Sequence, residues 1–125
     1  AGRWAEVQVG GEEVVMEPLV LMLILHALLH YPLQGDWLSK AKNHTLSLVP
    51  DEAIWPGALA SHAAIHAGGV WLAPGSWFLA GCEFLAHAGI DYAKCDGLIS
   101  YNQDQALHVA CKVFWFIILI SVSAA

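Results

Sequence analysis

Histidine and aspartate residues recur in pairs four positions apart along this chain. The pairs are His26/His30, His62/His66, His87/Asp91 and Asp104/His108. Residues four apart share one face of an α-helix, so each pair places two donor groups within about 6 Å of each other. Neutral imidazole and carboxylate are ligands for zinc, iron and manganese. The spacing therefore predicts helices whose polar faces meet at a metal site.

The last two pairs lie on either side of a predicted turn at Asp96–Gly97. If the flanking helices are antiparallel, three pairs of side chains face each other across them: Asp91/Asp104, His87/His108 and Glu83/Lys112. The third pair lies one helical turn deeper than the others. We expect Glu83 and Lys112 to neutralise each other as a buried structural ion pair.

Together, the paired side chains exceed the four ligands of one tetrahedral site. They predict either two ions or a set of residues that orient the ligands. The expected cofactor is one or two divalent ions of zinc, manganese or iron. A bound ion would lower the pKa of a water ligand toward 7, and Asp104 or Asp91 would act as general base or orient a ligand histidine. The predicted metal ligands are His26, His30, His62, His66, His87, Asp91 and His108.

The composition sets the class of protein that must position these groups. The chain has 125 residues, of which 58% are hydrophobic and 13% charged, about half the usual charged fraction. One domain fits this length. Its formal charge is −6 and no basic stripe is present, so the sequence predicts no nucleic-acid partner. The composition instead favours a small membrane protein whose main partner is the lipid bilayer.

Apolar periodicity predicts four helices, over residues 17–33, 57–72, 77–93 and 101–122. We expect an all-α, up-down-up-down transmembrane bundle, with helices at or just below the roughly 17–25 residues that a span needs. Lys40 and Lys42 lie in the first loop and Lys94 in the third. Positive charge near cytoplasmic ends then predicts a multi-pass protein of the bacterial inner membrane with these loops in the cytoplasm.

Residues 1–15 show neither helical nor strand periodicity. Gly-Gly-Glu-Glu at 10–13 is encoded by purine-rich codons and ends two codons before Met16, where a bacterial ribosome-binding site would fall. We therefore expect residues 1–15 to be a disordered segment or a non-native leader. Residues 16–125 are expected to form a single four-helix membrane domain.

Over roughly residues 19–120 the chain resembles the domain-of-unknown-function 3307 family of small bacterial and phage membrane proteins. The matching motifs are His26…His30…Gln34, His62, His87…Asp91 and Asp104-Gln105-Ala106-Leu107-His108. The chain departs from the family pattern at His30, where the family has an aspartate; the exchange keeps a ligand but removes a negative charge. The family layout is similar to that of membrane-bound metal-dependent hydrolases. The resemblance thus implies hydrolysis of a lipid or lipid-linked substrate.

Three other functions fit the same residues. Paired histidines on facing membrane helices could ligate haem iron, although the neighbouring aspartates disfavour a large apolar macrocycle. Buried histidine and aspartate side chains could instead conduct protons or ions. The chain could also be a non-catalytic bacterial or phage accessory protein, in which the polar residues only fix the register of the helices.

Overall fold

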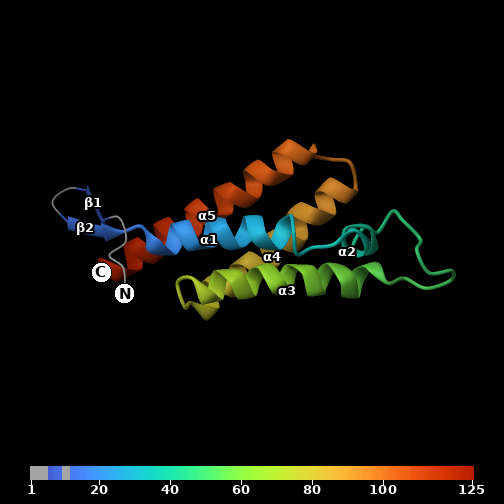
Figure 1. Cartoon of the computed structure of the whole chain (residues 1–125), viewed down its shortest axis with the longest axis horizontal. Helices are drawn as coiled ribbons and strands as arrows, with labels where there is room; N and C mark the ends of the chain where they lie inside the picture. Colours follow the sequence, from blue (N-terminus) through green and yellow to red (C-terminus); the bar gives the residue numbers. More distant parts are fainter. Residues whose placement is uncertain (1–5, 10–11) are drawn as a thin grey trace.

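The computed structural model describes residues 6–9 and 12–125, and nearly all of them belong to one helical unit. Its elements are β1 (Glu6–Val9), β2 (Glu12–Val15), α1 (Glu17–His30), α2 (Asp36–Ala41), α3 (Trp55–Leu72), α4 (Trp77–Cys95) and α5 (Tyr101–Ser123). The long helices α1, α3, α4 and α5 alternate in direction, and α2 lies in the connection between α1 and α3 (Figure 1). The predicted helical domain is confirmed.

Local sequence signals set the ends of these helices. The Ser76 side chain accepts a hydrogen bond from the backbone of Leu79 and caps α4. Ser100 and Gln103 form a reciprocal capping box at the start of α5. Gly97 has a φ of 78°, which allows the chain to reverse between α4 and α5 where other residues would be strained. These caps fix the register that brings α4 and α5 face to face.

The four-helix prediction missed α2 and misplaced the end of α1. Helix α1 ends at His30, three residues before the predicted end, because the following Tyr31-Pro32 step disfavours helical geometry. Helix α2 has six residues, too few for an apolar periodicity to be visible. It starts after Gly35, whose φ is 75°, and an ion pair of 2.8 Å joins Asp36 to Lys40 across one turn.

The described part of the N-terminal segment forms a hairpin that the sequence analysis did not predict. Strands β1 and β2 are antiparallel, with Glu6 opposite Val15 and Val9 opposite Glu12. Residues 1–5 and 10–11 of the expected leader lie outside the described residues. The assignment of residues 1–15 to a leader stays a prediction.

The four long helices pack as a closed ring. Helix α3 packs on α4, α4 packs on α5, and α1 packs on both α3 and α5. An apolar core fills the end of the ring that carries the α3–α4 turn; its buried members are Met22, Val70, Leu79, Trp115 and Phe116. The other end of the ring has a polar interior, which is where the predicted site residues lie.

Besides its apolar core, the bundle buries a set of polar side chains and exposes many large apolar ones. Ile24, Phe78 and Phe114 are more than half exposed, whereas polar residues such as Glu83 and Lys112 are only 1% exposed. Within the described residues, α5 is the one helix long and apolar enough to cross a bilayer. Its best 18-residue window has a mean hydropathy of 2.0 and is only 22% buried. Helix α1 is apolar but shorter, with 14 residues.

The closest approach of α1 to α3 gives a stability prediction. A Cβ atom added at Gly69 would lie 3.1 Å from Leu29 Cδ1 and 3.5 Å from Leu25 Cβ, whereas one at Gly68 would meet nothing within 4 Å. We expect Gly69→Leu to lower the free energy of unfolding by about 1–3 kcal/mol through overpacking. Gly68→Leu should instead raise it by about 0.5–1 kcal/mol through helix propensity. Equilibrium unfolding in detergent micelles measures the stability of both variants. Equal stabilities would contradict close packing of α1 on α3 at Gly69.

Candidate metal centre

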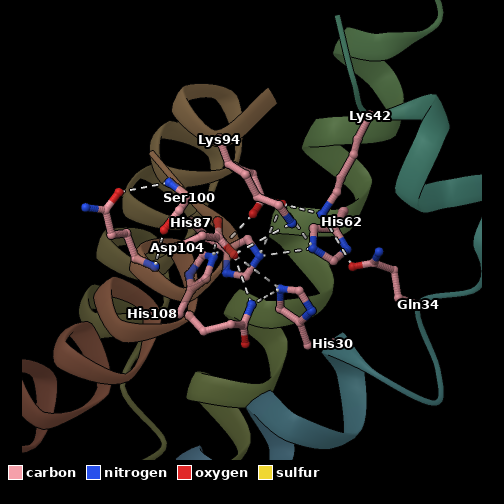
Figure 2. Close-up of polar contacts among 12 residues, drawn as sticks. His30, Gln34, Lys42, His62, His87, Lys94, Ser100, Asp104 and His108 are labelled. Atoms are coloured by element: carbon pink, nitrogen blue, oxygen red, sulfur yellow. Dashed lines mark hydrogen bonds and ion pairs between the residues drawn. The ribbon is translucent and has the colours of Figure 1, made fainter. Parts of the chain in front are cut away.

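All eight paired histidine and aspartate residues lie in the polar half of the bundle. None of these side chains is more than 6% exposed, and His87, Asp104 and His108 are at or near zero. Neighbouring imidazole rings have centroids between 3.9 and 6.4 Å apart. Figure 2 shows side chains from α1, α3, α4 and α5 pointing toward one another. The helical spacing in the sequence therefore brings these residues together at one level, as expected.

Helices α3 and α4 contribute a first group of donor atoms. His62 Nε2 lies 3.1 Å from His87 Nε2 and 3.2 Å from Asp91 Oδ2. His87 Nε2 lies 3.6 Å from the same carboxylate oxygen. One ring nitrogen each of His62, His66 and His87 falls within a span of 4.8 Å. Three imidazoles with this separation could hold a metal ion.

Helices α1, α4 and α5 contribute a second group. His108 Nε2 lies 3.2 Å from Asp91 Oδ1 and 3.4 Å from Asp104 Oδ1. His30 Nε2 lies 3.9 Å from Asp104 Oδ2. One donor atom each of His30, Asp91, Asp104 and His108 falls within 4.8 Å of the others. The geometry thus places Asp104, which was predicted as a base or an orienting residue, among the ligand donors as well.

Several donor atoms of the centre lack hydrogen-bond partners among the described residues. Both ring nitrogens of His26 and of His66 are buried and unpaired, as are Asp104 Oδ1 and His108 Nδ1. An unsatisfied buried polar group costs about 1–3 kcal/mol. The His26 ring lies 5.3 Å from the ring of His66 and 5.2 Å from that of His108, so it touches both groups. A divalent ion would bind one nitrogen of each histidine ring and the free Asp104 oxygen, so the residues present fit a metal.

Lys42 enters the centre from the end of α2. Its Nζ donates to Asp91 Oδ2 at 2.6 Å and to Gln34 Oε1 at 3.4 Å, and the residue is only 3% exposed. Figure 2 shows the long side chain reaching inward toward His62. The sequence analysis used Lys42 only as a mark of a cytoplasmic loop and missed its place in the site.

Lys94 and Gln105 surround Asp104. Lys94 Nζ lies 3.9 Å from Asp104 Oδ2 and 4.8 Å from the centre of the Tyr101 ring. The Gln105 amide donates to Asp104 Oδ2 at 2.9 Å and lies 3.0 Å from His30 Nε2. These contacts fix the orientation of the Asp104 carboxylate and of the His30 ring. Gln105 is part of the Asp-Gln-x-x-His motif, which was its signal in the sequence.

The predicted ion pair lies one turn below the centre. Lys112 Nζ donates to Glu83 Oε1 at 2.5 Å, and the Trp115 indole donates to Glu83 Oε2 at 2.7 Å. His87 Nδ1 lies 3.2 Å from Glu83 Oε1. Glu83 therefore holds the His87 ring so that its other nitrogen, Nε2, faces the centre, as carboxylates do for metal-binding histidines. Trp115, which had no role in the sequence analysis, completes the hydrogen bonding of Glu83.

None of the family models, curated proteins or solved structures compared with this chain matches it. The resemblance to the domain-of-unknown-function 3307 family therefore stays a prediction. Function is inferred below from the geometry and chemistry of the site.

Proposed function

We propose that this chain is an integral membrane metalloprotein that hydrolyses a lipid or lipid-linked substrate. The observation that carries the proposal is the convergence of six buried histidines and two buried aspartates from four helices, with the ring nitrogens of His26 and His66 unpaired. Buried groups of this kind persist when they satisfy one another or bind a metal. The number of nitrogen and carboxylate donors favours zinc, manganese or iron over softer ions.

A bilayer location is supported by the exposure of large apolar side chains and the burial of polar ones. Exposed apolar residues on the outer faces of the bundle would contact lipid, and the buried polar residues would be shielded from it. We propose that all four long helices are spans, with α1 and α3 crossing a locally thin region. Lys40 and Lys94 lie at the end that carries the first and third loops, which would be the cytoplasmic end of a bacterial inner-membrane protein.

The proposed reaction class rests on the resemblance to membrane-bound metal-dependent hydrolases. A bound divalent ion lowers the pKa of a water ligand and makes it a nucleophile near neutral pH. Asp104 Oδ1 accepts no hydrogen bond among the described contacts, so this carboxylate can either bind an ion or accept a proton from the water on it. The centre lies at the end of the bundle near α2, where a lipid headgroup would reach it while its chains stay in the bilayer.

Haem binding is disfavoured by the packing of the imidazoles. The rings of His66 and His87 stack at 3.9 Å and those of His87 and His108 at 4.1 Å, which leaves no space for a porphyrin between them. An absorption spectrum of the purified protein checks this directly, because a haem protein would show a Soret band.

Metal analysis tests the proposal. We expect at least one zinc, manganese or iron ion per chain in protein purified in detergent. His87→Ala and Asp104→Ala should lower the metal content at least twofold, whereas His44→Ala, a histidine outside the centre, should not change it. Metal-loaded protein should also release product from a panel of ester and phosphoester lipids. Metal below stoichiometry in the wild type and all variants would rule the proposal out, and would favour a proton conductor or an accessory protein.

A further inference from the structure

The two oxygens of Asp91 face different groups of donors. Oδ2 lies 3.2 Å from His62 Nε2 and 3.6 Å from His87 Nε2. Oδ1 lies 3.2 Å from His108 Nε2, on the side of α5. The Asp91 carboxylate therefore stands between the imidazoles of α3 and α4 and those of α5 and α1. We infer that the centre binds two divalent ions and that Asp91 bridges them; this inference rests on the proposed metal-binding function.

Each side of Asp91 has a group of donors for one ion. The first group is His62, His66 and His87, and Asp91 Oδ2 adds an oxygen beside His62 and His87. With Asp91 Oδ1, the second has His30, Asp104 and His108. Four nitrogen and oxygen ligands complete a tetrahedral zinc site, and these ligands lie about 2.0–2.2 Å from the ion. Together the two groups and Asp91 offer seven side chains, which exceeds the four ligands of one tetrahedral ion.

The unpaired atoms are divided between the two sites. His66 belongs to the first set and Asp104 Oδ1 to the second. His108 would use Nε2, the nitrogen that faces Asp91 and Asp104. An ion in only one site would leave buried donors of the other without partners. The His26 ring lies between the two sets and is free to bind either ion. Satisfaction of buried polar groups therefore favours two ions over one.

A third grouping, Glu83 with His87 and His108, also falls within 4.8 Å. Glu83 Oε1 accepts from Lys112 and Oε2 from Trp115, and neither donor belongs to the two sets. Glu83 is thus a positioning residue for His87 and not a ligand. Asp91 Oδ2 accepts from Lys42, so an ion at the first site would replace that ammonium group at this oxygen. Enzymes with two-metal hydrolytic sites hold their ions about 3.5–4 Å apart.

Metal counting with manganese and zinc tests the inference on the full chain in detergent. After chelation and reloading, we expect two zinc ions per chain by equilibrium dialysis. His66→Ala should lose the ion of the first site and His30→Ala that of the second, so each variant should bind one. Asp91→Asn should bind at most one ion. His44→Ala, outside both sets, should still bind two. Helix content by circular dichroism shows that each variant is folded.

Electron paramagnetic resonance gives a second readout. Two Mn²⁺ ions bridged by Asp91 are magnetically coupled, so the wild type should lack the hyperfine pattern of an isolated ion. His66→Ala and His30→Ala should each restore it. One ion per wild-type chain, or an isolated-ion spectrum at full loading, would overturn the bridged centre but leave the proposed function standing. Binding of no ion would contradict both proposals.

Discussion

Replacing Lys112 by methionine is expected to lower the free energy of unfolding by about 3–5 kcal/mol, the usual loss when one partner of a buried ion pair is removed. The pair is almost completely enclosed, with side-chain exposures of 2% for Lys112 and 1% for Glu83. Methionine preserves the apolar stem, so the loss comes from the uncompensated carboxylate. Reversible unfolding in mixed detergent micelles measures the change.

The double variant Glu83→Gln/Lys112→Met separates charge from packing. Removing both charges should recover most of the stability, because a buried ion pair contributes little over neutral groups of similar volume. Lys40→Met is the matched control, since its ion pair with Asp36 is largely exposed and contributes about 0–1 kcal/mol. A Lys112→Met protein as stable as this control would contradict the role of the buried pair.

The candidate centre was largely predictable because helical periodicity is a local property. Side chains four residues apart must share a helix face, and the symmetry of the α4 and α5 motifs about Gly97 fixed which residues oppose each other. The pairing of Glu83 with Lys112 followed from the same register, and the structure contains that contact. The predicted turn at Asp96–Gly97 made this half of the fold predictable from the sequence, whereas the capping box at Ser100 was identified only in the structure.

The contribution of α2 was not predictable in the same way. A helix of six residues has no recognisable periodicity, and its position depends on tertiary contacts of a long connection. Charge balance was the one available signal. No lysine or arginine side chain had been assigned to Asp91 or Asp104, because Lys112 was already paired with Glu83. A buried carboxylate needs a positive partner, which could have pointed to Lys42.

The number of membrane spans is also hard to predict from hydropathy in a bundle with a polar interior. Polar residues that line the interior of a bundle lower the hydropathy of each helix even when its outer face is apolar. Helix α3 carries two buried histidines, and α4 carries Glu83, His87 and Asp91 on its inner face. Hydropathy alone therefore singles out α5 among the described helices, and four spans remain a proposal.

Lys42→Met is expected to destabilise the metal-free protein by about 3–5 kcal/mol, because Asp91 loses the buried cation that lies 2.6 Å from its Oδ2 atom. In metal-loaded protein, Lys42→Met is expected to lower the free energy of unfolding much less. A divalent ion at the first site would take the same oxygen and supply the positive charge that Lys42 otherwise provides. The Lys42 ammonium group and an ion at the proposed first site would therefore compete for Asp91 Oδ2.

Thermodynamic linkage makes this prediction quantitative. If loading with zinc shrinks the loss caused by Lys42→Met by about 3 kcal/mol, the variant must bind zinc roughly 100-fold more tightly than the wild type. Unfolding experiments with and without zinc measure the stability loss in each state. Competition with a chelator measures the zinc affinities of the variant and the wild type. Lys112→Met provides the contrast, since Glu83 is not a ligand and its loss should be nearly independent of zinc. Equal losses for Lys42→Met in the two states would show that the lysine and the metal do not compete for Asp91.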